Sequence, residues 1–403
     1  MNARAGRFPL FDSLRAIAAL AVLGTHAAVY AASPGLMPYA ARLEVGVAIF
    51  FVISGFLLYR PFVRARLLAE RPPRLRAYAW RRSLRIVPNY WVALTVTTIV
   101  LGTAGVFTLS DGPLYYGFAQ TWTEPTIGGG LSQAWTLCIE VTFYAFLPIW
   151  AWAMRRAPGA SFERRMRGEL LALALVFAGS IAYKILLLAG GNQHQIRITP
   201  ALDSLPGFLD QFAIGMGLAV LTVWLERRER LPRPLAVIER FPILPWLVAG
   251  VAFWAASTQI GLTGRVLEDF TPREYVLRHL LYALIALGMV LPAVVGDSRR
   301  GIVRRVLANP ALLFLGLISY SIYLYGPAVL DQLQRWHFHS PGPAYAGLLL
   351  VGGVITIAVS AVSYYLVERP ALSLKRLVPP DGIPRGEAIA EPAPATVAGV
   401  REG

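Results

Sequence analysis

The chain has 403 residues, 56% of them hydrophobic, and a mean hydropathy of +0.53. A soluble protein of this length is rarely so apolar, so the composition favours an integral membrane protein over a soluble globular domain. The net charge of +15 fits either an anionic membrane or a nucleic acid, and the positions of the charges decide between them.

Ten apolar segments are long enough to cross a bilayer, whose core of about 30 Å needs a helix of about 20 residues. In chain order they are 10–31, 44–63, 88–107, 133–154, 169–190, 206–225, 243–261, 275–296, 311–333 and 344–366. We therefore predict an all-α, polytopic integral membrane protein with about ten transmembrane helices. Residues 1–376 form the membrane domain, and the Pro- and Ala-rich tail 377–403 is expected to be disordered in the cytoplasm.

The basic residues gather on one side of this predicted domain. Of the 38 Lys and Arg residues, thirty lie in the termini and the loops on the same side, six lie in the opposite loops, and Arg15 and Lys184 fall inside segments. By the positive-inside rule, both termini are predicted to be cytoplasmic. The arginines are spread over several loops, so the basicity reflects topology and no nucleic-acid partner is expected.

The first segment contains FDSLRAIAALAVLGTH (11–26), which carries ionisable residues where lipid is expected. Arg15 and His26 are eleven positions apart, so they share one stripe of the helix, about 16 Å apart along its axis. Charges inside a membrane are candidates for function. Alternatively, Arg15 reaches lipid phosphates and His26 is a packing residue. A cleaved signal peptide is disfavoured by Arg15 and by the length of the segment.

A basic stretch, RLRAYAWRRSLRIVPNYW (74–91), precedes and enters the third segment. Arg81, Arg82 and Arg85 are spaced to lie close together on a helix, and guanidinium groups match phosphate oxygens. This spacing fits a site for a phosphate-bearing ligand. It fits an interfacial helix that touches anionic lipid equally well.

Glu140, in WTLCIEVTFYAFLP (135–148), lies about 10 Å inside a predicted span. A buried carboxylate needs a cationic partner or a proton, so it either pairs with a neighbouring helix or takes part in proton transfer. Asp210 is a shallower example. Lys184 is expected to extend to the outer interface.

Later segments add polar groups within apolar surroundings. Ser319, Tyr320 and Tyr323 are able to hydrogen-bond across helices, and Glu368 with Arg369 is expected to form a local ion pair at the cytoplasmic interface. The chain has one cysteine, Cys138, and its five histidines form no helical metal pair. Neither a disulfide nor a metal site is therefore expected.

In this order, these stretches resemble the acyltransferase-3 family of integral membrane O-acyltransferases, over about residues 9–377. The opening stretch resembles that family's Arg-x10-His signature, and VGVAIFFVISGFLLYRPF (45–62) its second-helix motif. RRSLRIVPNYW (81–91) is similar to its basic loop, and AWTLCIEVTFY (134–144) to its Trp-Ser-Leu-x-x-Glu stretch. ISYSIYLYGP (318–327) and YYLVERP (364–370) resemble its closing motifs.

Three positions depart from the family's pattern. Ala48 stands where many members carry an acidic residue, Val141 where many carry a second glutamate, and Gly326 where many carry histidine. The expectation is that acceptor choice or the polar network around the site differs here.

The resemblance implies transfer of an acyl group, often acetyl, from cytoplasmic acyl-CoA to a hydroxyl of a surface glycan, lipid or secondary metabolite. The protein would sit in the cytoplasmic (inner) membrane and hold no bound cofactor. His26 would act as the general base, with a covalent acyl-His intermediate as the less favoured version. Arg15 would orient the donor or hold a polar network beneath His26.

The remaining site residues follow from the same resemblance. Arg81, Arg82 and Arg85 would hold the phosphates of CoA, and Glu140 would position His26. Cys138 is not favoured as an acyl carrier, because no activating base is evident beside it.

Two other function classes remain open on sequence. Ten helices with charges inside the membrane also fit a secondary transporter, although no paired Gly- or Pro-broken spans occur in two matching halves. A membrane scaffold without chemistry would leave His26 unexplained.

Overall fold

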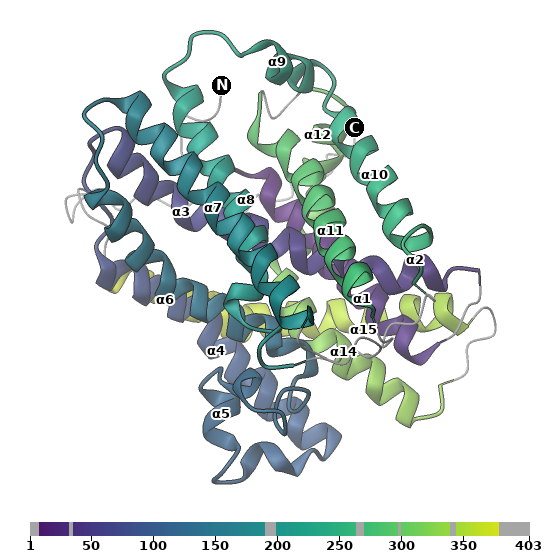
Figure 1. The fold of residues 1–403 in the computed structure, drawn as a ribbon. Coiled ribbons are helices and arrows are strands. Elements are labelled where there is room, and N and C mark those ends of the chain that lie inside the picture. Colours follow the sequence, from purple (N-terminus) through teal and green to yellow (C-terminus); the bar gives the residue numbers. More distant parts are fainter. Residues whose placement is uncertain are drawn as a thin grey trace, which may run out of the picture.

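The computed structural model describes residues 8–31, 35–189, 199–262, 270–296, 300–338 and 344–378. Within these ranges the chain forms helices joined by loops and contains no β-strand, which confirms the predicted all-α class (Figure 1). The predicted tail lies outside the described residues from position 379 onward.

Eight candidate membrane spans in the described chain are continuous helices or are built around one. They contain α1 (Leu10–Tyr30), α3 (Gly46–Leu67), α4 (Leu75–Leu101), α6 (Trp135–Arg156), α7 (Phe162–Ala189), α8 (Leu205–Glu226), α11 (Pro272–Val294) and α15 (Ala344–Ser363). Two bent pairs bring the number to ten: α9 (Arg233–Arg240) meets α10 (Ile243–Thr258) at 87°, and α13 (Pro310–Leu317) meets α14 (Ser319–Arg335) at 72°. The prediction of about ten spans is confirmed on this count.

The third span differs from its predicted position. The basic stretch and the apolar segment predicted at 88–107 form one helix, α4, which begins at Leu75 and ends at Leu101. It ends there because Gly102 adopts a left-handed conformation, with φ of +66°, which glycine reaches without steric cost. The predicted arginine cluster therefore lies on a continuous helix rather than on a separate loop.

The central helix α3 packs against α8 with their backbones close together. A Cβ atom on Gly55 would lie 2.3 Å from the carbonyl oxygen of Phe212, and one on Gly215 would lie 2.1 Å from that of Val52. Small residues allow this close approach between membrane helices. The contact fixes the position of α3, whose side chains line the cavities described below.

Acidic residues on α7 and α8 hold the arginine-rich end of α3. Arg66 Nη1 lies 2.7 Å from Glu169 Oε1, and Glu226 forms ion pairs with both Arg60 and Arg64. All these residues lie at helix ends that the charge pattern assigns to the inner side. Figure 1 likewise shows α9 and α12 (Ile302–Leu307) at one end of the molecule and α5 (Gly112–Tyr116) at the other.

A second set of charges holds the opposite end together. Glu44 Oε1 accepts hydrogen bonds from Arg278 at 2.9 Å and Tyr282 at 3.0 Å. In the loop before α8, burial raises the pKa of Asp203 to about 7, although the nearby Arg278 guanidinium acts to lower it. Residues predicted on the outer side thus contact one another. The cytoplasmic placement of the arginine-rich end stays a prediction.

The predicted exposure of Lys184 at the interface is wrong. Its side chain is fully buried, and Nζ lies 2.8 Å from Oδ1 of the equally buried Asp210. Ser180 donates a second hydrogen bond to the same oxygen at 3.1 Å. Lys184 and Asp210 neutralise each other, so both charges can be buried between α7 and α8.

Candidate active site

A cavity of about 80 Å³, here called the chamber, lies among α1, α3, α4, α6 and α14. Four of the six predicted site residues line it, namely Arg15, Arg82, Arg85 and Glu140. Its other polar lining residues are Ser54, Thr136, Tyr144, Ser319, Tyr320 and Tyr323. Helices distant in sequence therefore bring the basic stretch, the first segment and Glu140 to one place.

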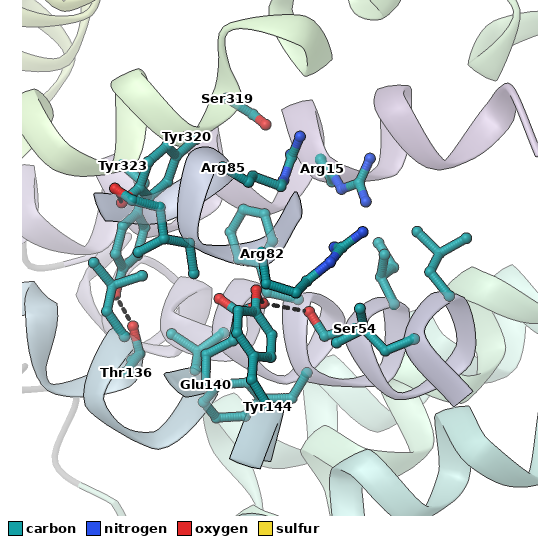
Figure 2. Close-up of a pocket in the computed structure, with 18 residues that line it drawn as sticks. Arg15, Ser54, Arg82, Arg85, Thr136, Glu140, Tyr144, Ser319, Tyr320 and Tyr323 are labelled. Atoms are coloured by element: carbon teal, nitrogen blue, oxygen red, sulfur yellow. Dashed lines mark hydrogen bonds between the residues drawn. The ribbon is translucent and has the colours of Figure 1, made fainter. Parts of the chain in front are cut away.

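The carboxylate of Glu140 is held by two hydroxyl groups. Its Oε1 accepts hydrogen bonds from Ser54 Oγ at 2.7 Å and from Tyr144 OH at 2.8 Å (Figure 2). Tyr144 lies four residues after Glu140 on the same helix, a spacing that predicts such a contact. Ser54 lies on α3, and its role is not foreseeable from one sequence. We expected Glu140 to position His26, and the hydrogen bonds described for its side chain do not include that residue.

Three guanidinium groups enter the chamber from one side. Figure 2 shows Arg15, Arg82 and Arg85 gathered there, while Thr136 and Tyr323 lie at the far side. Arg15 Nη1 lies 2.8 Å from Asp12 Oδ1. Within the described chain, Arg82 and Arg85 form no salt bridge with a carboxylate. Glu140 is the carboxylate among the lining residues of the chamber, so guanidinium groups outnumber carboxylates there. Such a lining favours an anionic ligand.

A larger hollow of about 420 Å³ adjoins the chamber. The two share the lining residues Leu57, Leu58 and Arg82. The arginines that line the hollow are Arg60, Arg64, Arg71, Arg74, Arg81 and Arg82. The three predicted phosphate-binding residues thus lie in series, with Arg81 in the hollow, Arg82 lining both cavities and Arg85 in the chamber.

His26 lies away from this cluster. It is partly buried in α1 and lines neither the chamber nor the hollow. Arg15 and His26 are eleven residues apart on one continuous helix, which corresponds to about 16 Å along the axis. Val22, one turn before His26, belongs to the apolar cluster that also contains Leu137 and Tyr323. Of the predicted catalytic residues, Arg15 and Glu140 share the chamber and His26 does not.

The far side of the chamber is closed by a hydrogen-bonded tyrosine. Tyr323 OH donates to the backbone oxygen of Gln133 at 2.6 Å and lies 2.5 Å from Thr136 Oγ1. The Gln133 side chain in turn donates to the carbonyl oxygens of Tyr323 at 3.2 Å and Leu324 at 2.7 Å. Pro327 has no N–H for the carbonyl four residues earlier, which is that of Tyr323, so Gln133 replaces the missing helical hydrogen bond.

The expected ion pair of Glu368 with Arg369 at the interface is wrong. Glu368 is only 1% exposed and ends a π-helical turn, Tyr364–Glu368. Its carboxylate accepts a hydrogen bond from Ser321 at 3.5 Å, and Ser321 also accepts one from Asn89 on α4. This network joins α4, α14 and the end of α15 beside the chamber.

Two of the three departures from the family pattern, Ala48 and Gly326, fall on tightly packed positions, and Val141 is partly buried. Ala48 is 2% exposed, and a Cβ on Gly326 would lie 2.8 Å from Leu23 Cδ1. A histidine at position 326 would therefore displace Leu23. Cys138 is 1% exposed and lies in the apolar cluster with Val22, not on the chamber.

Comparisons with known proteins point to one family. The acyltransferase-3 family model, an acyltransferase domain, matches residues 9–365. BcsY of Komagataeibacter xylinus, provisionally named a membrane-bound transacylase, is 27% identical over 363 residues, covering 86% of this chain and 80% of that protein. Nodulation protein 10 of Rhizobium leguminosarum bv. viciae is 27% identical over 395 residues, covering 91% and 93%.

A Staphylococcus aureus protein (strain COL), provisionally named an O-acetyltransferase, is 24% identical over 388 residues, which cover 90% of this chain and 57% of that protein. No solved structure matches the chain significantly.

Proposed function

The chain belongs to the acyltransferase-3 family of membrane O-acyltransferases, and on that premise we propose which groups it transfers and how. It moves an acyl group, in the simplest case acetyl, from cytoplasmic acyl-CoA to a hydroxyl of a glycan, lipid or metabolite at the outer face of the cytoplasmic membrane. The names of two relatives, a transacylase and an O-acetyltransferase, support acyl and acetyl transfer.

The series of arginines from the hollow into the chamber is the observation that supports acyl-CoA as the donor. CoA bears several phosphates on an extended molecule, and guanidinium groups bind phosphate oxygens in pairs. Arg81 meets the donor in the hollow, Arg82 at the junction and Arg85 in the chamber. The acyl end of the donor then points away from these arginines, along α1 toward His26.

The chemistry assigned to His26 is general base catalysis. Its imidazole takes the proton of the acceptor hydroxyl while the oxygen attacks the thioester carbonyl. The new C–O bond forms, the C–S bond breaks, and His26 returns the proton to the departing CoA thiolate. Arg15, near the inner end of the same helix, orients the donor. Helix α1 therefore carries both a residue that binds the donor and the residue that acts as the base.

Glu140 takes a different part from the one expected on sequence. Its carboxylate, held by Ser54 and Tyr144, forms an acidic patch on the chamber wall beside Arg82 (Figure 2). Like charges repel, so this patch directs donor phosphates toward the guanidinium side. Glu140 is accordingly a positioning residue for the donor rather than a partner of His26.

Binding of CoA tests this proposal without knowledge of the acceptor. We expect the triple variant Arg81→Ala/Arg82→Ala/Arg85→Ala to lose at least about tenfold in affinity for acetyl-CoA, and the corresponding lysine variant to recover part of it, because lysine lacks the paired donors. The measurement is calorimetry in nanodiscs of zwitterionic lipid, which removes competition from anionic lipid.

The matched control removes three exposed arginines predicted on the same side, Arg155, Arg164 and Arg167, which line neither cavity. Its affinity should equal that of the wild type. If the Arg81/Arg82/Arg85 alanine variant binds acetyl-CoA as tightly as the control variant and the wild type do, the arginines of α4 serve only as lipid anchors and the donor site is elsewhere.

A further inference from the structure

Two aromatic side chains of the chamber belong with Val22, the residue one turn before His26, to one region of apolar packing. Phe50 and Tyr323 both line the chamber, and their ring centroids lie 6.0 Å apart at an interplanar angle of 75°. An acyl group that enters from the arginine side meets these rings before it reaches the level of His26. We call the pair the aromatic barrier.

One half of the barrier is rigidly held. The Tyr323 hydroxyl contacts the Gln133 backbone and Thr136, and the Gln133 side chain binds the backbone at Tyr323. Tyr323 therefore has little freedom to rotate away without losing several buried hydrogen bonds, each of which costs about 1–3 kcal/mol when left unmade. Phe50 forms no hydrogen bond through its side chain, so it is the part that can move.

Helix geometry relates His26 to this barrier through Val22, which lies one turn earlier on α1. Val22 packs in one cluster with Tyr323, and Phe50 packs against that cluster. His26 follows Val22 by four residues, which is about 6 Å along the helix axis and nearly the same face. The thioester carbonyl must pass the level of Val22 to reach the imidazole. The acyl chain lies at the end of the donor, so it meets the aromatic barrier first.

The space before the barrier is small. The chamber has about 80 Å³, whereas a cavity of roughly 150 Å³ is known to hold a benzene molecule. Acetyl adds few atoms to the pantetheine arm that enters this space, whereas a hexanoyl chain adds four more methylene groups, so the longer chain requires more side-chain displacement.

We propose, resting on the acyl-CoA donor proposed above, that Phe50 and Tyr323 determine the acyl length that this enzyme accepts. The pantetheine arm carries the acyl group past the arginines to the aromatic barrier, where a short acyl group displaces only Phe50 on its way to His26. Longer chains must displace Tyr323 as well and break its bonds to Gln133 and Thr136. The two aromatic residues are therefore specificity-determining residues, and the arginines contribute equally to binding of every donor.

The test compares CoA, acetyl-CoA, butyryl-CoA and hexanoyl-CoA in calorimetric binding to the full-length protein in zwitterionic nanodiscs. For the wild type we expect hexanoyl-CoA to bind at least about tenfold more weakly than acetyl-CoA, since a pocket distinguishes methylene groups by about this factor. Phe50→Ala should reduce that ratio at least about fivefold while leaving the affinity for CoA itself unchanged.

Two further variants sharpen the result. Tyr323→Phe keeps the ring but loses the hydroxyl contacts, so it should improve hexanoyl-CoA binding more than acetyl-CoA binding. Phe253 lies on α10, outside the chamber, so Phe253→Ala is the matched control for the loss of a phenylalanine ring. It should leave the ratio of hexanoyl-CoA to acetyl-CoA affinity unchanged. If Phe50→Ala does not fold, Phe50→Val answers the same question with a smaller change in volume.

The outcomes separate this inference from the proposed function. If CoA and acetyl-CoA bind but the wild type shows no preference for short chains, or if Phe50→Ala leaves the ratio unaltered, the aromatic barrier does not select acyl length. If neither CoA nor acetyl-CoA binds, the proposed donor is wrong and the inference falls with it.

Discussion

His26 is the residue on which the proposed chemistry depends, and its surroundings are apolar. Val22, one turn before it, belongs to the apolar cluster that contains Tyr323 and Leu137. General base catalysis needs the neutral imidazole, and burial among apolar side chains favours that form. The first prediction therefore concerns this side chain alone.

We expect His26→Ala to lower the rate of acyl transfer by about 10²–10⁴, the usual loss when a general base is removed. Binding of acetyl-CoA should change little, because His26 lines neither the chamber nor the hollow. The measurement is transfer of label from radioactive acetyl-CoA in membranes of an expressing strain, with membrane abundance checked by immunoblot.

The matched control is His337→Ala, an exposed histidine after the end of α14, which should retain wild-type transfer. Wild-type transfer by the His26→Ala variant at normal abundance would remove His26 from the mechanism.

Single residues also show where sequence reasoning stops. The depth of Glu140 in its span followed from counting residues, and its contact with Tyr144 follows the i,i+4 rule. Its second partner, Ser54, lies 86 positions away on another helix. The wrong prediction for Lys184 has the same origin, because the partner that allows its burial, Asp210, lies on a different helix. Distances between helices are set by packing, and the pattern within one segment does not contain them.

At the level of helices, α14 is shaped by two irregularities. The bend of 72° between α13 and α14 brings Ser319 and Tyr320 to the chamber, and Pro327 removes one hydrogen bond from the helix interior. Gln133 compensates for that loss from outside the helix. The sequence predicted one continuous span at 311–333. Pro327 marks the missing hydrogen bond in the sequence, but no proline or other residue pattern marks the bend between α13 and α14.

We expect Gln133→Ala to destabilise the protein, by about 1–3 kcal/mol, because it leaves the buried carbonyl of Tyr323 without a donor. The measurement is the thermal unfolding midpoint in detergent, with the exposed Gln259→Ala as the matched control that should not change it.

A double-mutant cycle identifies the cause. In a Pro327→Ala background the new N–H of residue 327 can donate to the Tyr323 carbonyl, so the effect of Gln133→Ala should become smaller. An equal loss in both backgrounds would show that Gln133 stabilises the fold in another way.

For the whole molecule, the distribution of charge predicts the orientation in the membrane. The helix ends rich in arginine lie together, and Glu169 and Glu226 bind several of them. The number of spans and their approximate limits followed from hydropathy alone, since each span must match the bilayer thickness. The meeting of α1, α3, α4, α6 and α14 around one cavity did not, because it depends on contacts between distant segments.

We expect reporter fusions after Ala160 and after residue 382 to report a cytoplasmic location, and a fusion after Gly129 to report the outside. The reason is the positive-inside rule applied to thirty basic residues against six. Paired alkaline phosphatase and fluorescent-protein fusions provide the measurement, each serving as the control for the other. A cytoplasmic signal at Gly129 would invert the proposed direction of donor entry.

The aromatic barrier also has an electrical consequence. A water-filled path between the two faces would let ions move down the membrane potential, which is worth about 2.3 kcal/mol per elementary charge for each 100 mV. The arginine-lined chamber ends at Phe50 and Tyr323, and Gln133 and Thr136 bind the tyrosine hydroxyl there. Much of the voltage would fall across this thin apolar layer, so the barrier would act as the insulator while the chamber gives a charged donor deep access to the membrane.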